Sequence, residues 1–215
     1  MESHIVGGDP IDIELCPSAV LIYNLGSMCA GSILNSYSVL SAAHCFDHNS
    51  DVEEISVHVG SQHRRDEKAT IHDVMRVVVH VDYNKATAFA ADIAIVFLEY
   101  AITFGKKAKK YNGPLSEVGL MKTKLRYIPL SECSKLHGIP FSPDMFCLYG
   151  DAKHDSCKGD SGGGVIWKGF LVGIVSHGDG CAGKNKPSVY VSTYYYRGWI
   201  RKQVLYHVRY YCDHI

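Results

Sequence analysis

Short apolar runs separated by turn residues fill the first half of the chain. Four runs rich in valine and isoleucine occupy residues 19–23, 38–42, 55–59 and 77–81. Runs of this length and composition predict β-strands rather than helices. The residues between them are typical of turns and include Gly26, Gly60, Asn84 and the cluster at 47–51. Their spacing is that of an antiparallel barrel or sandwich.

The second half repeats this pattern and then ends differently. Strand-like runs lie at 125–130 and 188–193, with a glycine-rich strand pair over 162–175. Beyond Tyr195 apolar residues recur at helical spacing, at Tyr196, Trp199, Ile200, Val204 and Val208. This spacing predicts an amphipathic C-terminal α-helix.

A lysine-rich stretch followed by Asn-Gly-Pro separates the two halves. Such a charge run is more often a solvated linker than a binding patch, so we expect a linker at 106–114. The expected units are then one β-domain over 5–105, a second over 115–194, and a helix with a tail over 195–215.

Composition narrows the class of protein. The 215 residues include 22 basic and 22 acidic side chains, so the formal net charge is zero, and 47% of the residues are hydrophobic. This balance argues against a nucleic-acid binder and against a disordered chain. No apolar run reaches the length of a membrane span, so we expect no membrane contact. The prediction is a soluble, globular monomer.

Eight cysteines indicate the compartment. None are arranged in the paired C-x-x-C pattern of structural zinc sites, so disulfides are the better interpretation. Disulfides predict an oxidising environment, and hence a secreted, extracellular protein. Residues 1–4 lack the charged and apolar regions of a signal peptide. We expect them to be a non-native or pro-segment remnant, and the given start to belong to a fragment or an incomplete gene model.

The string Gly-Asp-Ser-Gly-Gly-Gly at 159–164 carries the first candidate chemistry. Glycines around Ser161 allow a tight turn that exposes its hydroxyl, while the amides of Gly159 and Ser161 can converge on one point, as in an oxyanion hole. An ordinary glycine-rich hairpin is the alternative interpretation.

A serine hydroxyl is a poor nucleophile without a base. His44, at the end of an apolar run and beside Cys45, can supply one near neutral pH. Asp92 opens the apolar run Ile-Ala-Ile-Val-Phe-Leu, and a buried carboxylate needs a partner. Orienting His44 would provide it. A structural histidine and a strand-capping aspartate are the alternatives.

Five strings support the catalytic interpretation together. IVGG, SAAHC, DIAIVFL, DSCKGDSGG and SHG occur in this order between Ile5 and about Ile200. They resemble the trypsin/chymotrypsin family of serine endopeptidases, and with ELCPS the sequence looks similar to arthropod digestive or allergen-type members. The resemblance implies an all-β fold of two antiparallel six-stranded β-barrels with a C-terminal α-helix. The site would lie between the barrels, with His44 and Asp92 from the first and Ser161 from the second.

The same resemblance implies further roles. It pairs the cysteines as Cys29–Cys45, Cys133–Cys147 and Cys157–Cys181, and leaves Cys16 and Cys212 either bonded to each other or free. Asp155 would form the floor of the primary specificity pocket, where a carboxylate would pair with a substrate Lys or Arg. Residues of the pocket wall would be Ser176, His177, Gly178 and Ser188.

Several positions depart from the family pattern. Ser188 stands where the family has glycine, so its side chain would intrude on the pocket and favour Lys through a bridging water. His177 replaces tryptophan, which removes apolar surface beside the cleft. Between Asp92 and Cys133 the chain is about two dozen residues shorter than the family pattern, and nothing resembles the strand that normally begins the second barrel. Either the given sequence omits a segment of the protein, or the chain is naturally shorter, in which case the second barrel is open and exposes an unpaired edge.

The resemblance also leads to expectations about activation and metal binding. A freed amino group of Ile5 would pair with Asp160, but His4 precedes it, so no trypsin-type cleavage site is present. As written, the chain should be inactive or zymogen-like. Ser61 lies where some relatives carry an acidic calcium ligand, so we expect no calcium, no other metal and no cofactor.

The leading hypothesis is a secreted serine endopeptidase that cleaves after Lys or Arg and meets protein substrates and protein protease inhibitors. A second hypothesis is a catalytically impaired homologue that acts as a binding or decoy protein. A third, a disulfide-bonded β-scaffold without a site, predicts that His44, Asp92 and Ser161 do not converge.

Overall fold

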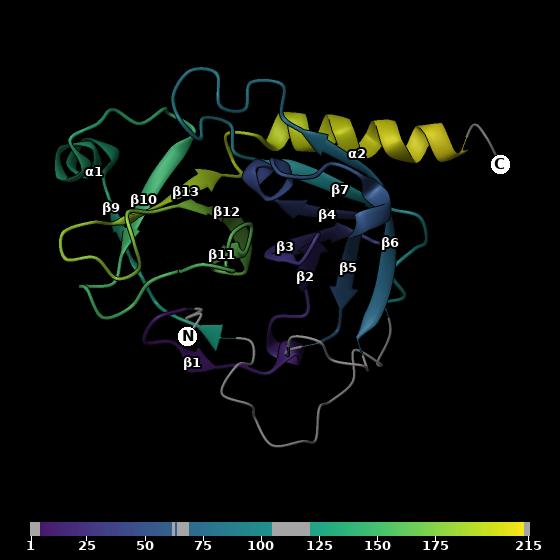
Figure 1. The fold of residues 1–215 in the computed structure, drawn as a ribbon, viewed down its shortest axis with the longest axis horizontal. Coiled ribbons are helices and arrows are strands. Elements are labelled where there is room, and N and C mark those ends of the chain that lie inside the picture. The colour runs from purple at the N-terminus through teal and green to yellow at the C-terminus, as the bar shows by residue number, and fades with distance from the viewer. Residues whose placement is uncertain (1–4, 62, 64–68, 105–120, 213–215) are drawn as a thin grey trace.

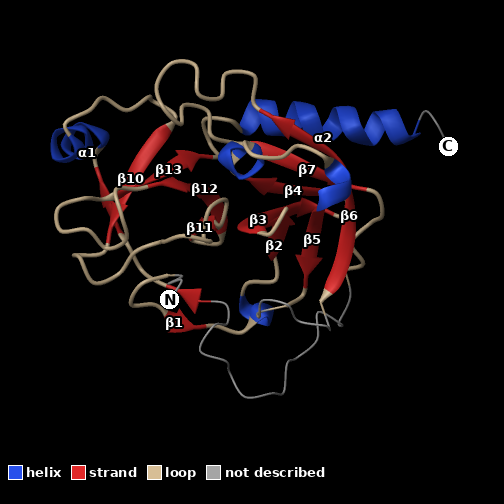
Figure 2. Cartoon of the chain, in the orientation of Figure 1, coloured by secondary structure: helices blue, strands red, loops and turns tan. Residues whose placement is uncertain are grey.

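Most of the regular secondary structure in the described chain is antiparallel β-structure, as the short apolar runs predict (Figure 2). The structure is a computed structural model and describes residues 5–61, 63, 69–104 and 121–212. Residues 1–4 and the expected linker 106–114 lie outside the described residues. The first-half elements are β1 (Asp9–Pro10), η1 (Ile13–Leu15), β2 (Ala19–Asn24), β3 (Ser27–Asn35), β4 (Ser38–Ser41), η2 (Ala43–Phe46), η3 (Val52–Glu54), β5 (Ile55–Val59), β6 (Thr70–Val79) and β7 (Ala94–Leu98). The later elements are β8 (Met121–Lys122), β9 (Arg126–Ile128), α1 (Leu130–His137), β10 (Met145–Tyr149), β11 (Gly164–Trp167), β12 (Phe170–His177), β13 (Ser188–Ser192) and α2 (Arg197–Cys212).

The first barrel is closed and has six strands in the order β2-β3-β4-β7-β6-β5. Strand β7 is buried at every residue. Its alternate residues serve two cores, because Val96 and Leu98 fill the barrel while Ile95 and Phe97 face outward into a second cluster. This double burial explains why the sequence of β7 is apolar without interruption.

The second barrel is a five-stranded sheet in the order β11-β12-β13-β10-β9 (Figure 1). All its neighbouring strands pair antiparallel. Within the described residues no sixth strand joins β9 to β11, which agrees with the expected shortage of chain before Cys133. The all-β, two-barrel architecture is therefore confirmed, with one barrel closed and the other open.

The described residues also form two α-helices. The C-terminal α2 was predicted, and it lies along the first barrel (Figure 1), where Trp199, Ile200 and Val204 pack on the outward face of β7. Helix α1 was not predicted, because only Cys133 among its eight residues is buried and no periodic apolar signal arises. Among the described residues, no helix combines the length and apolar character needed to cross a membrane.

Three disulfides join cysteines in the described part of the chain, and they are the pairs that the family resemblance implies: Cys29–Cys45, Cys133–Cys147 and Cys157–Cys181. Cys16 forms no disulfide in the described part of the chain. The side chain of Cys212 lies outside the described residues, so its pairing stays open.

Candidate active site

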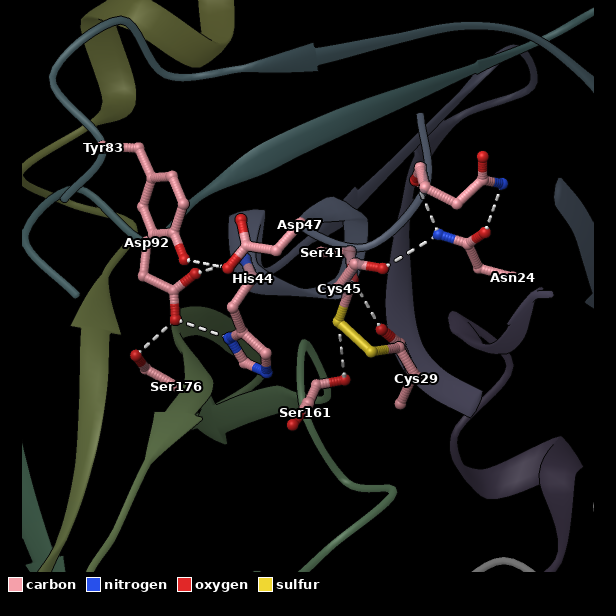
Figure 3. The surroundings of a disulfide bond; sticks show 12 residues. Asn24, Cys29, Ser41, His44, Cys45, Asp47, Tyr83, Asp92, Ser161 and Ser176 are labelled. Carbon is pink, nitrogen blue, oxygen red and sulfur yellow. Dashed lines mark hydrogen bonds and ion pairs between the residues drawn. A yellow bond between two sulfur atoms is a disulfide. The ribbon is translucent and has the colours of Figure 1, made fainter. Parts of the chain in front are cut away.

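Strand pairing in the first barrel brings His44 and Asp92 together. Strands β4 and β7 are antiparallel, and Ser41 at the end of β4 pairs with Ala94 at the start of β7. The residues just after β4 and just before β7 therefore lie at the same end of the barrel. There the fully buried Asp92 accepts hydrogen bonds from the backbone amide of His44 (2.9 Å) and from its ring Nδ1 (2.8 Å), as Figure 3 shows.

This contact fixes the tautomer of His44. A carboxylate only accepts hydrogen bonds, so Nδ1 carries the proton and Nε2 is left as an acceptor. Burial lowers the pKa of His44, but the hydrogen bond and negative charge of Asp92 outweigh it, with a smaller contribution from Asp47. The pKa of His44 is raised above its ordinary value, so His44 is a stronger base than a free imidazole.

A second carboxylate, Asp47, lies close enough to His44 to contribute to its raised pKa. It accepts a hydrogen bond from the hydroxyl of Tyr83 at 2.8 Å (Figure 3). Burial and this hydrogen bond raise the pKa of Tyr83, so its hydroxyl stays protonated and holds the carboxylate in place. Asp47 and Tyr83 were not singled out from the sequence, because neither belongs to a recognisable motif.

The loop that carries Ser161 forms two tight turns. The carboxylate of Asp160 accepts a hydrogen bond from Cys157 N at 2.8 Å, and the carbonyl of Asp160 accepts one from Gly163 N. The amides of Gly159 and Ser161 donate no hydrogen bond within the described chain. Two neighbouring free amides are what an oxyanion requires.

This loop is held against the first barrel. The carbonyl oxygen of Ser161 accepts a hydrogen bond from Ala30 N on β3 at 2.7 Å. Gly162 has a φ of +78°, and a Cβ there would lie 2.2 Å from Ser41 Oγ and 2.4 Å from Ala30 O. Only glycine permits this approach. The backbone of Ser161 is thus fixed beside the segment that carries His44, and Ser161 Oγ makes no hydrogen bond to any described residue.

The expected pocket floor, Asp155, is buried and already hydrogen-bonded. Its Oδ1 accepts from Ser188 Oγ at 2.6 Å and from Ser156 N at 2.9 Å, and its Oδ2 accepts from Ala182 N at 2.8 Å. A Cβ built on Gly178 would lie 3.0 Å from Ser188 Oγ, so the hydroxyl occupies the space beside this wall. The expected intrusion of Ser188 is present as a direct contact with Asp155.

His177 connects the cleft wall to the candidate catalytic carboxylate. Ser176 Oγ donates to Asp92 Oδ2 at 2.5 Å, so its single proton is committed and His177 Nδ1, 3.0 Å away, must donate to Ser176. The ring of His177 stacks on Phe89 at a centroid distance of 4.4 Å. Burial lowers the pKa of His177 to about 4, so the ring is neutral at physiological pH.

Ile5 and Asp160 line the same cavity, and no bond between them is present. The next residue, Val6, forms a two-bond bridge with the backbone of Asp155. Ser61 Oγ donates to His63 O and accepts from His63 N, so it is engaged in its own turn.

One group of potential metal ligands gathers among the described residues, namely Cys29, His44 and Cys45. Its two sulfur atoms are joined in a disulfide, so they are not available as thiolate ligands.

Comparison with known proteins decides the family. A family model described as Trypsin matches residues 5–121 and 115–200. The chain belongs to the trypsin family. Hypodermin-B of Hypoderma lineatum is 30% identical over 93% of this chain and 87% of its own. Trypsin alpha-4 of Lucilia cuprina is 31% identical with the same two coverages, and trypsin epsilon of Drosophila erecta is 30% identical over 94% of this chain and 88% of its own. The chain is therefore similar to insect serine proteases over most of its length.

The comparisons also locate the departure from the trypsin family. The alignment with hypodermin-B spans 227 positions, more than the 215 residues of the chain, so the relative has residues that this chain lacks. The family model matches in two pieces that meet at residues 115–121. This boundary lies within the stretch from Asp92 to Cys133 that was expected to be short.

Phe89 is a site residue that the sequence did not indicate. It stacks on His177 and presents its edge to His44 at a centroid distance of 6.0 Å. It adopts a positive φ of 59°, which is rare for an aromatic residue, within a loop held by a hydrogen bond from Phe89 N to Asn84 Oδ1. Asn84 was recognised only as a turn residue, and no local pattern shows where such a loop directs its side chain.

Proposed function

We propose that the chain is a secreted serine endopeptidase that cleaves peptide bonds after Lys or Arg, with Lys preferred. The observation that carries this proposal is the buried carboxylate of Asp92, bound to both the backbone and Nδ1 of His44. An arrangement that fixes one tautomer and raises the basicity of Nε2 serves proton transfer. Its expected targets are extracellular proteins and protein inhibitors, which the single chain would bind as a monomer.

The proposed reaction has two stages. Ser161 Oγ attacks the substrate carbonyl while His44 Nε2 takes its proton, and the amides of Gly159 and Ser161 stabilise the oxyanion. His44 then gives the proton to the leaving amine, which leaves an acyl group on Ser161. Water, deprotonated by His44, then attacks this ester; the bond from the acyl carbon to Ser161 Oγ breaks, His44 returns the proton to Oγ, and the acid is released. Asp92 stabilises the imidazolium in both stages without accepting its proton.

The preference for Lys follows from the contacts of Asp155. A guanidinium binds a carboxylate best through two parallel hydrogen bonds, which require both oxygens along one edge. Ser188 and Ser156 already occupy Oδ1, and Ala182 occupies Oδ2. A lysine ammonium is a compact charge and can donate to the free lone pairs of Ser188 Oγ or to a bridging water. Lys therefore needs less rearrangement than Arg.

The same contacts favour a second candidate function. Asp155 is only 4% exposed, so a substrate side chain must displace an internal hydrogen bond to reach it. If that displacement does not occur, the chain would bind inhibitors or substrates without turnover, as a binding or decoy protein.

The test uses refolded protein trimmed to begin at Ile5, so that its amino group can pair with Asp160. A fluorophosphonate probe with peptide mapping reports whether Ser161 is reactive, and matched Lys, Arg and Phe reporter substrates measure kcat/KM. The proposal predicts labelling at Ser161, loss of labelling in Ser161→Ala, and turnover in the order Lys, Arg, Phe. Ser188→Gly should raise the Arg rate relative to Lys, and Asp155→Asn should abolish both.

The outcomes separate the two functions. Labelling of Ser161 without hydrolysis of any reporter would support the binding protein. No labelling in a folded sample would contradict the catalytic assignment, and a preference for Phe would contradict the role of Asp155.

A further inference from the structure

A large cavity of about 1210 Å³ lies between the two barrels on the side of the open sheet edge. Its lining includes Val20 of β2, Phe146 of β10 and Val175 of β12. Both edge strands of the second sheet reach it as well, through Tyr127 of β9 and Trp167 of β11. The cavity thus occupies the gap that separates the open barrel from a closed one, and it exceeds the range of about 300–1,000 Å³ typical of small-molecule sites.

The lining is mainly apolar, and it continues onto the surface. Four large hydrophobic side chains at its rim are between 55% and 72% exposed: Tyr127, Ile166, Trp167 and Tyr194. Large exposed apolar side chains gathered around one cavity mark an interaction site more often than a free surface. The occupant should therefore present hydrocarbon to the cavity.

The charged residues in the described lining are two lysines and one aspartate. Lys122 and Lys124 are exposed, which places both ammonium groups at the mouth. Asp160 is half-buried, and its carboxylate accepts a hydrogen bond from Cys157 N. The described lining therefore carries two positive charges against one negative charge, with both lysines exposed, and it complements an anion attached to an apolar chain.

The edge strands argue against an extended peptide as the occupant. Strand β9 has three residues and β11 has four, and the pairing of β11 with β12 shifts register between Val165 and Ile166. Short, bulged edges offer few aligned backbone groups for strand addition. The apolar lining and the two lysines are therefore better evidence for the chemistry of the occupant than the unpaired backbone groups of the edge strands.

We propose that this cavity is a binding site for a long-chain alkyl carboxylate, with its hydrocarbon between the barrels and its carboxylate at Lys122 and Lys124. The proposal does not depend on the proteolytic function, because binding in this cavity requires no reaction of the residues that line it. The lining does include Gly159 and Asp160, so an occupied cavity contacts the reverse side of the loop that carries Ser161.

The test measures binding to the full chain by isothermal titration calorimetry below the micellar concentration of each probe. Dodecanoate, 1-dodecanol and dodecylamine share one chain length and differ in charge. One dodecanoate per chain should bind, with the alcohol about tenfold weaker, because two exposed lysines each add a modest attraction. In the double variant Lys122→Gln, Lys124→Gln, the affinity for dodecanoate should fall to that for 1-dodecanol. The affinity for 1-dodecanol should be the same as in the unchanged protein.

A steric variant locates the site. Ala19, at the start of β2, lines the cavity, so Ala19→Trp should weaken all binding at least about tenfold. The matched control Ala101→Trp makes the same change at an exposed position outside the lining and should have no effect. A thermal melt with unchanged midpoint shows that each variant is folded.

Four results would overturn the proposal. These are no binding of dodecanoate, equal binding of dodecanoate and dodecylamine, binding that survives in a folded Ala19→Trp variant, and a dimer that dodecanoate does not disrupt. The last would assign the cavity to a second copy of the chain.

Discussion

Replacing His177 with phenylalanine should change how the stability of the protein depends on pH. The ring of His177 is stacked on Phe89 and is kept neutral by burial, which lowers its pKa from 6.5 to about 4. In the unfolded chain the same ring regains its ordinary pKa. Between these two values the unfolded chain binds a proton that the folded chain does not, so the wild-type protein loses stability as the pH falls from about 6.5 to 4.

The magnitude follows from the two pKa values. Each pKa unit corresponds to about 1.4 kcal/mol, so the complete loss is about 3 kcal/mol. His177→Phe retains a stacked ring but cannot be protonated. It also loses the hydrogen bond from Nδ1 to Ser176, which costs about 1 kcal/mol at every pH. The variant should therefore be less stable than the wild type at pH 7.5 and more stable at pH 3.5, and the two curves should cross.

Urea unfolding at half-unit steps from pH 7.5 to 3.5, with the disulfides intact, gives both curves. His48→Phe makes the same substitution at an exposed position, where folding removes little water from the side chain. Parallel curves for the wild type and His177→Phe, separated by a constant amount, would refute the assignment of a buried neutral histidine at this position.

Two further predictions concern the site itself. Asp47→Asn removes the second negative charge beside His44, so the acidic limb of kcat/KM, expected above pH 6.5 in the wild type, should move to lower pH; a pH-rate profile that does not move would exclude Asp47 as a contributor. Gly162→Ala places a methyl group within 2.2 Å of a neighbouring atom and should lower fluorophosphonate labelling of Ser161 at least about a hundredfold. Gly169→Ala has a similar φ of +81° with nothing within 4 Å, so it should keep full labelling, and equal losses in both variants would point to backbone strain alone.

The apolar pattern predicted a strand well where the buried residues of that strand face a single hydrophobic core. Strands β2, β5 and β13 lie close to the predicted runs, and α2 begins near Tyr195, where the spacing changes. Helix α1 was missed because its burial depends on the disulfide to β10, a contact between distant segments. The order of strands in each sheet follows from long-range pairing, which local periodicity does not encode.

The candidate site shows the same division. His44, Asp92 and Ser161 were proposed as catalytic residues because each lies in a motif with a known chemical requirement, and the structure shows the contact between His44 and Asp92. Phe89 and Asp47 were not, since their proximity to His44 arises from how loops fold over the barrel rather than from any spacing along the chain. The family resemblance placed Ser188 near Asp155, and the structure shows a direct bond between the two. The effect of Ser188 on substrate preference stays a prediction.

The attachment of the Ser161 loop to the first barrel has a consequence for how the proposed activity depends on folding. His44 and Asp92 lie beside the closed barrel, whereas Ser161 precedes β11 of the open sheet and is held by the bond from Ala30 N to Ser161 O and the close approach of Gly162. In the proposed mechanism neither half contains a complete set of reacting groups. Activity by that mechanism would therefore appear only once the two halves have docked, and it would be lost as soon as they separate.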